Sequence, residues 1–166
     1  CNTPADTAAL GKDVDGENAI GHINYPSVIG MLLYLEHSCP DISFATHQCA
    51  RYTHSPKLSH ENALKRIGRY LKGTLDKGLI LTPSEKLKID CYPDADFARL
   101  WNRENVQDPH CVWSRTGYVI NLADCPVLWK SRLQTEIAEY VALSTSCRDL
   151  FPLIDLTKEI CSIFEM

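Results

Sequence analysis

Apolar residues recur at intervals of three and four between residues 24 and 73, a spacing that is typical of amphipathic helices. Asn24 can cap a first helix, and Pro26 fits its first turn. The run 39–41 (Cys-Pro-Asp) ends this helix and starts a second one. The inward positions are Val28, Met31, Leu32 and Leu35 in the first helix, and Ile42, Ala45, Cys49 and Tyr52 in the second.

A third helix is predicted over residues 59–73, with Ser59 as its cap and Gly73 in the C′ position that ends it. One side of this helix is apolar and the other side is basic. The apolar positions are Ala63, Leu64, Ile67, Tyr70 and Leu71, and the basic ones are Lys65, Arg66, Arg69 and Lys72. Residues 24–73 are therefore expected to form three short helices around one core.

Beyond residue 74 the pattern changes to alternation, which is typical of half-buried strands. Strands are predicted at 79–81, 87–94, 116–122 and 127–131, with a long loop at 97–114 and a hairpin turn at 123–126. A last helix is expected from about Glu136, with a kink at Pro152. Its inward stripe is Tyr140, Leu143, Cys147, Leu150 and Ile154. The pattern predicts an α+β protein whose helical and strand parts meet near residues 74–86.

The composition fits a folded chain of 166 residues that is 45% hydrophobic. No apolar run is long enough for a transmembrane helix, and residues 1–22 read as a polar connecting arm without a signal peptide. Because the chain opens at Cys1 without Met, we expect that it was cut from a longer protein or that its gene is incomplete. None of the eight cysteines form a C-x-x-C pair, so free thiols in a reducing compartment are expected.

The net charge of −4 conceals a basic block. Residues 51–77 contain seven Lys and Arg against two acidic residues, a net charge of +5. Such a block in an acidic chain is either a footprint for nucleic-acid phosphates or simply a solvated helix face. Charge alone leaves both readings open.

Five collinear blocks resemble the Pol polyprotein of copia-type retrotransposons. Residues 25–81, from YPSVIGMLLYL to GLIL, are similar to the thumb and connection of its reverse transcriptase. CYPDADFA (91–98), SRTGYVI (114–120), CPVLWKSRLQT (125–135) and AEYVALS (138–144) resemble successive blocks of its ribonuclease H. The resemblance implies a connecting arm (1–22), a thumb-like three-helix bundle (23–81), and a truncated ribonuclease H-like unit of three antiparallel strands and one helix (86–166).

The resemblance also implies site residues and partners. Asp94 matches the first metal-binding Asp of the nuclease and Asp96 is its neighbouring acid, while Glu139 matches the metal-binding Glu. In the parent enzyme such carboxylates hold Mg²⁺ ions, which serve cleavage of the RNA strand. Four basic residues would contact phosphates of an RNA–DNA hybrid or template–primer duplex, namely Lys65, Arg66, Arg69 and Lys72. The remainder of Pol would be a further partner, in a cytoplasmic virus-like particle and the nucleus, with no membrane involved.

Four departures from the family predict that this chain is catalytically inactive. The chain contains no Asp-Asp pair of the polymerase, and it stops at Met166, before the nuclease's remaining Asp residues. About six residues are missing before Glu139, equivalent to roughly 9 Å of helix. Arg99 replaces a small glycine and either competes with metal or points outward. The alternative function is a non-catalytic nucleic-acid-binding module that uses the basic helix 59–73.

Overall fold

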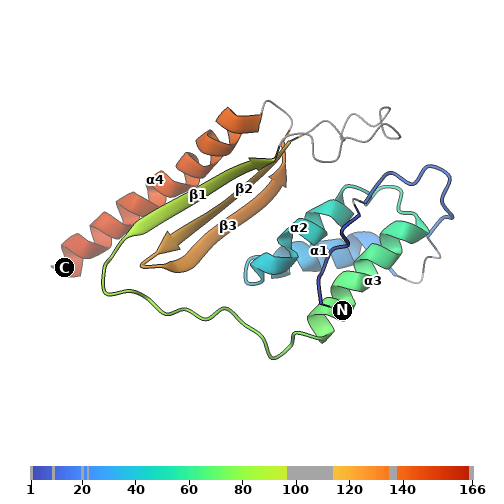
Figure 1. Cartoon of the computed structure of the whole chain (residues 1–166), viewed down its shortest axis with the longest axis horizontal. Helices are drawn as coiled ribbons and strands as arrows, with labels where there is room; N and C mark the ends of the chain where they lie inside the picture. Colours follow the sequence, from blue (N-terminus) through green and yellow to red (C-terminus); the bar gives the residue numbers. More distant parts are fainter. Residues whose placement is uncertain are drawn as a thin grey trace. The chain divides into compact units, whose positions relative to one another are not determined.

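The computed structural model describes residues 2–8, 10–19, 21, 23–96, 114–134 and 138–164, which fold as two compact units (Figure 1). The first unit ends at Leu79 and the second begins at Ile80. In the described residues the first unit contains helices α1, α2 and α3, and the second contains strands β1, β2 and β3 followed by α4. The predicted α+β class is confirmed. No helix among these residues has both the length and the apolar character needed to cross a membrane.

Helices α1 (Tyr25–Leu35) and α2 (Pro40–Ala50) form much of the first core. The predicted cap of α1 is confirmed, because the Asn24 side chain accepts a hydrogen bond from the Ser27 N–H at 3.2 Å. The Tyr25 hydroxyl donates to the Cys49 carbonyl at 2.9 Å and thereby ties α1 to α2. All four predicted inward residues from Ile42 to Tyr52 are buried. The α1 stripe is confirmed at Leu32, which is buried, and wrong at Met31, which is 61% exposed; Tyr25 and Ile29 complete the face toward the core.

Helix α3 (Leu58–Lys72) begins one residue earlier than predicted, and Ser59 is not its cap. His60 Nδ1 accepts a hydrogen bond from the Lys57 N–H at 2.9 Å and satisfies the start of the helix instead. Leu64 and Ile67 are buried as expected. The helix ends at Gly73 as predicted, but Gly73 is the C-cap itself, with a φ of −83°, rather than the C′ residue.

Within the first unit, the N-terminal arm packs against the helical bundle, whose residues donate hydrogen bonds to backbone carbonyl groups of the arm. The Tyr52 hydroxyl donates to the Leu10 carbonyl at 2.9 Å, and the His60 ring bonds the Gly11 carbonyl through Nε2 at 2.8 Å. Farther along the arm, the Leu58 N–H donates to the Glu17 carbonyl at 2.9 Å. These contacts hold the arm beside the start of α3.

The second unit is built on a three-stranded antiparallel sheet in the order β1-β2-β3. Its strands are β1 (Ile89–Asp96), β2 (Arg115–Leu122) and β3 (Cys125–Leu133). The turn of the β2–β3 hairpin comprises only Ala123 and Asp124, both with positive φ (49° and 67°), and is therefore shorter than predicted. A register shift follows at once, because Asn121 pairs with Pro126 and Ile120 with Leu128. The extra residue Val127 forms a bulge, a position at which a neighbouring Pro is tolerated.

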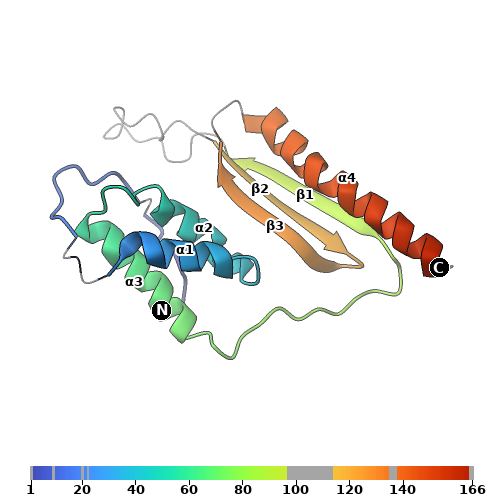
Figure 2. The same ribbon diagram turned by 180° about the vertical axis from the view of Figure 1, so that it is seen from behind.

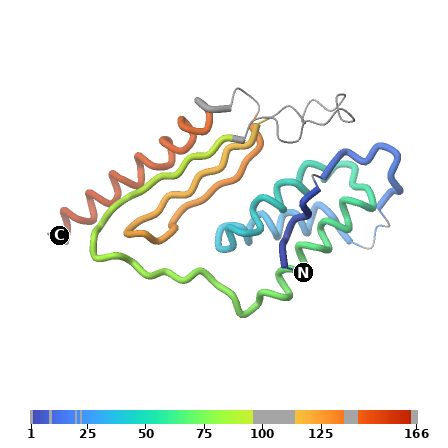
Figure 3. The backbone as a smooth tube through the Cα atoms, in the orientation of Figure 1, coloured from blue at the N-terminus to red at the C-terminus, as the bar shows by residue number. Residues whose placement is uncertain are grey.

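The strand predicted at Leu79–Leu81 is wrong. The chain between α3 and β1 forms neither helix nor strand from Lys77 to Lys88 (Figure 3). Leu79, Ile80 and Leu81 are 45%, 88% and 57% exposed. Their residue types favour a strand, but a strand requires a hydrogen-bonded neighbour and the described sheet provides none.

Helix α4 (Ala138–Phe164) covers one face of the sheet and contacts β1 and β2 (Figure 2). The helix continues on both sides of Pro152. Its predicted stripe was wrong at Leu143, which is 54% exposed. The neighbouring small residues Ala142 and Ser146 are buried instead, at 3% and 1% exposed. Small side chains let the helix lie close to the sheet, and a stripe chosen by hydrophobicity alone misses them.

We expect Ile67→Ala to destabilise the first unit, because Ile67 is 1% exposed and its truncation leaves a cavity in the core. The loss is expected to be about 2–5 kcal/mol. Met31→Ala is the control, and it should cost less than about 0.5 kcal/mol because Met31 is largely exposed. Urea unfolding followed by far-ultraviolet circular dichroism measures both. Equal losses in the two variants would contradict the assignment of the core.

Candidate nucleic-acid interface and carboxylate site

The register of the sheet decides where the predicted carboxylate Asp94 lies. Asp94 is exposed near the carboxyl end of β1 and pairs with Gly117 of β2. Directly opposed residues of antiparallel strands share a face, and successive residues alternate between faces. Tyr118, the neighbour of Gly117, points toward α4, because its hydroxyl donates to Asp149 of that helix. Asp94 therefore lies on the sheet face opposite α4.

Glu139 lies in the first turn of α4, and this turn lies at the same end of the unit as the carboxyl end of β1 (Figures 1 and 2). The backbones of the two predicted carboxylate positions thus belong to the same end of the sheet. The side chains of Glu139 and Asp96 are outside the described residues, as are Arg99 and residues 135–137, where the connection before Glu139 is short. The predicted roles of these residues stay predictions.

No group of three or more His, Cys, Asp or Glu that could hold a metal occurs among the described side chains. Of the three predicted metal-binding carboxylates, only Asp94 has a described side chain, and it is exposed on the face away from α4. Two divalent ions need several shared carboxylate ligands. Asp94 is the one such ligand whose side chain is described, so the Mg²⁺ site stays a prediction.

A polar cluster between α4 and the sheet was not anticipated from the sequence. Asp149 accepts a hydrogen bond from the buried Tyr118 hydroxyl, and Lys130 Nζ lies 3.3 Å from the same carboxylate. The hydrogen bond from Tyr118, together with the hydrogen bond and charge of Lys130, outweighs burial and lowers the pKa of Asp149 below its ordinary value. Burial and the Asp149 carboxylate raise the pKa of the Tyr118 phenol. The cluster joins α4 to β2 and β3, and its role is to fix the helix on the sheet.

Two of the four predicted phosphate-binding residues are already engaged with acidic side chains. Lys65 Nζ lies 2.7 Å from Glu61, whose side chain is almost fully buried. Arg66 forms an ion pair of 2.7 Å with Asp6 of the arm and also donates to the Thr3 carbonyl and hydroxyl oxygens. A phosphate would have to displace these partners. The sequence could not reveal the Arg66 contacts, because Thr3 and Asp6 lie about 60 residues away along the chain.

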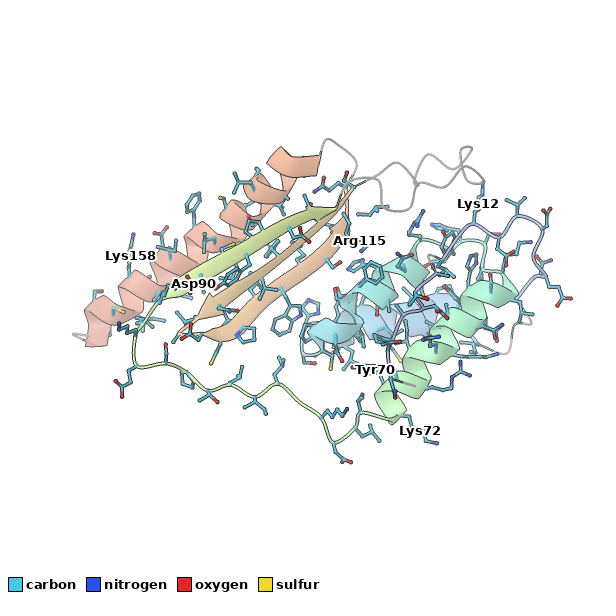
Figure 4. All side chains as sticks on the ribbon, in the orientation of Figure 1. Lys12, Tyr70, Lys72, Asp90, Arg115 and Lys158 are labelled. Carbon is cyan, nitrogen blue, oxygen red and sulfur yellow. The ribbon has the colours of Figure 1, made fainter. Side chains whose placement is uncertain are left out.

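The other two basic residues, Arg69 and Lys72, are exposed in the last turn of α3. Neither side chain forms a hydrogen bond or ion pair with another residue in the described part of the chain. Lys72 projects away from the bundle (Figure 4). Long cationic side chains in this setting can reach phosphate oxygens without losing an existing partner. The usable part of the predicted footprint is therefore the carboxyl end of α3.

Comparison with known proteins identifies transposon relatives. The chain is 33% identical over 142 residues to the retrovirus-related Pol polyprotein from transposon RE2 of Arabidopsis thaliana, covering 82% of this chain and 9% of that protein. The corresponding polyprotein from transposon RE1 of the same plant is 32% identical with the same coverage. The chain thus spans about a tenth of these relatives.

A short relative is the secreted RxLR effector protein 161 of Plasmopara viticola. It is 31% identical over 135 residues, which cover 77% of this chain and 89% of that protein. No model of a known protein family matches the chain, and no solved structure matches it.

Replacing Asp149 by Asn should destabilise the second unit at neutral pH by about 1 kcal/mol, after allowance for partial exposure of the carboxylate. Because the folded state lowers the pKa of Asp149, its contribution is complete above the unfolded pKa of about 4 and is lost as the pH falls through the folded value. The difference from wild type should therefore disappear in acid. Urea unfolding at neutral and at acidic pH measures it, with exposed Asp155→Asn as the control. A difference that does not depend on pH would refute the charge-based account.

Proposed function

Because the chain belongs to the Pol polyproteins of copia-type retrotransposons, we propose that it is the segment that joins the reverse transcriptase to the ribonuclease H. Residues 23–81 are then the thumb and connection, and residues 86–166 are the start of the nuclease. The order of elements supports this assignment, since three helices precede an antiparallel sheet and a helix that covers it. The parent polyprotein would copy RNA into DNA and cleave the RNA strand of the hybrid, with Mg²⁺, inside a virus-like particle.

The activity that we propose for this chain itself is binding to the backbone of a nucleic-acid duplex, without reading its bases. The observation that carries it is that the side chains of Arg69 and Lys72, at the end of α3, are exposed and have no partner among the described residues. Phosphate contacts by Lys and Arg are independent of sequence and release counterions from the duplex. Lys65 and Arg66 contribute less, because each would first have to leave a carboxylate at 2.7 Å.

We further propose that this chain does not cleave nucleic acid by itself. Its sequence has no Asp-Asp pair for polymerisation. For nuclease chemistry, the described face toward α4 presents Tyr118 and Lys130 around Asp149, whereas Asp94 lies on the opposite face. One oxygen of the carboxylate in this cluster, Asp149 Oδ2, already accepts from a phenol and lies beside an ammonium group, with which a metal would compete.

Charge reversal at both Arg69 and Lys72 should weaken binding to a short RNA–DNA hybrid and reduce its dependence on salt. Two phosphate contacts contribute about 1.8 to the slope of log Kd against log salt concentration, and the double variant to Glu should lose that amount. The matched control reverses Lys86 and Lys158, which are exposed in the second unit. Fluorescence anisotropy at several salt concentrations measures both. Equal effects of the two double variants would mean that net charge, rather than α3, drives binding.

The purified chain should show no Mg²⁺-dependent cleavage of the same hybrid in a gel assay. The reason is that Asp94 lies apart from the α4 side of the sheet and that the described carboxylates form no cluster. Asp94→Asn should therefore bind the hybrid as wild type does and should leave it equally intact. Cleavage by wild type that is abolished in Asp94→Asn would show that the carboxylates assemble a working site, and the proposal of inactivity would fail.

A further inference from the structure

Three oxygen atoms of the N-terminal arm surround the guanidinium group of Arg66. Its Nη1 donates to Asp6 Oδ2 at 2.7 Å, its Nη2 donates to Thr3 Oγ1 at 3.1 Å, and its Nε donates to the Thr3 carbonyl oxygen at 3.3 Å. Every nitrogen of the guanidinium group thus has an oxygen partner from residues 3–6. A guanidinium group binds the oxygens of a phosphate in the same multidentate way. The arm segment 3–6 therefore offers Arg66 the kind of acceptors that a nucleic-acid phosphate would offer.

Hydrogen bonds within the arm hold the segment 3–6 in this shape. Asp6 Oδ1 accepts from the Thr7 N–H at 2.8 Å, while Oδ2 accepts from Arg66. The Thr3 hydroxyl donates to the Ala5 carbonyl at 3.0 Å, and its oxygen accepts from Arg66. The hydrogen bond from Thr7 and the charge of Arg66 lower the pKa of Asp6 below its ordinary value, so the carboxylate is charged at neutral pH.

The arm is attached to the bundle in two different ways along its length. Residues 10–11 are held by neutral hydrogen bonds from Tyr52 and His60, whose side chains are buried. The Asp6 side chain, in contrast, is 61% exposed, and Ala5 adds only a small apolar contact with the core. Exposed ion pairs contribute little to stability and are screened by salt. The segment 3–6 can therefore leave α3 while residues 10–11 stay in place.

Lys65, the neighbour of Arg66, does not share this arrangement. Its partner Glu61 lies one turn earlier on the same helix, and the Glu61 side chain is only 2% exposed. Moving Lys65 to a phosphate would remove the countercharge of a buried carboxylate, which is costly. The carboxylate of Asp6 would instead return to water. Of these two engaged cations, Arg66 is therefore the one whose availability depends on the arm.

We propose that the arm segment 3–6 is an intramolecular phosphate mimic, which occupies Arg66 until a nucleic-acid duplex displaces it. This autoinhibitory contact rests on the proposed binding of α3 to the backbone of a duplex. Its release would add Arg66 to Arg69 and Lys72, which follow at intervals of three residues and are neighbours on the helix surface. A duplex carries one negative charge per about 1.7 Å of its axis, whereas the segment offers a single carboxylate. The duplex is thus the stronger competitor for Arg66.

Asp6→Ala should tighten binding to the short RNA–DNA hybrid by roughly two- to five-fold at low salt, because it removes the charge that competes with phosphate at Arg66. The same substitution made in an Arg66→Gln chain should give no such gain. Asp15→Ala is the matched control for net charge, since Asp15 is an exposed acid of the same arm, and it should change the affinity much less. Fluorescence anisotropy with the full chain measures all of these affinities.

The outcomes separate the autoinhibitory contact from the binding by α3 itself. Binding that depends on Arg69 and Lys72 but is equal in wild type and Asp6→Ala would overturn the contact alone. A gain that persists with Arg66→Gln, or an equal gain in Asp15→Ala, would also overturn it, because net charge would then explain the gain. No binding by either wild type or Asp6→Ala would overturn both proposals.

Displacement of the segment has a direct readout in the wild-type chain. The heteronuclear ¹H–¹⁵N nuclear Overhauser effect of the backbone amides at residues 3, 5, 6 and 7 should fall when the hybrid is added, because a released segment moves on the picosecond to nanosecond timescale. The amides of residues 10 and 11 should keep their values, since their anchors are neutral and buried. A segment that stays equally ordered in the complex would show that the duplex does not displace it, and the proposal would fail.

Discussion

A single buried imidazole fixes the start of the basic helix. His60 is fully buried, and each of its polar atoms has a partner: Nδ1 accepts from the Lys57 N–H, and Nε2 bonds the Gly11 carbonyl. This pattern requires the neutral tautomer that carries its hydrogen on Nε2. The ring also stacks on Tyr52, with centroids 4.0 Å apart. The rotation of α3 and the path of the arm follow from these contacts, and so does the approach of Asp6 to Arg66.

In the second unit, the register between β1 and β2 determines which residues lie on each face of the sheet. A slip of one residue would exchange the two faces of β1 relative to β2. The observed register pairs Cys91 with the fully buried Ile120 and Asp94 with Gly117. The small residues of α4 consequently pack on one face of the sheet, and the exposed carboxylate of Asp94 lies on the other face. The sequence separation between Asp94 and α4 does not predict which face of the sheet each occupies, because the faces are set by the register between β1 and β2.

Local signals in the sequence predicted the helices and three of the strands. The errors occur where a residue far away in the sequence determines a cap, a buried position or an ion pair. Ser59 is a reasonable cap by type, but the side chain of His60 satisfies the helix start once the arm holds its other nitrogen. Leu143 is more hydrophobic than its neighbour Ala142, yet the sheet admits the smaller side chain. The position of Asp94 in a strand was predictable, whereas the face it occupies was not. Likewise, the basic residues of α3 could be predicted from the sequence, whereas the ion pair of Arg66 with Asp6 of the arm could not.

The link between Tyr25 and Cys49 gives the first core a built-in chemical reporter. Burial raises the pKa of the Cys49 thiol to about 11, so the reactive thiolate is a minor species at neutral pH. The thiol is also 2% exposed, which keeps reagents away while the bundle is closed. Alkylation of Cys49 is then expected to proceed through openings of the helical bundle. Its rate, followed by mass spectrometry, is a measure of how often the helices separate in an otherwise folded chain.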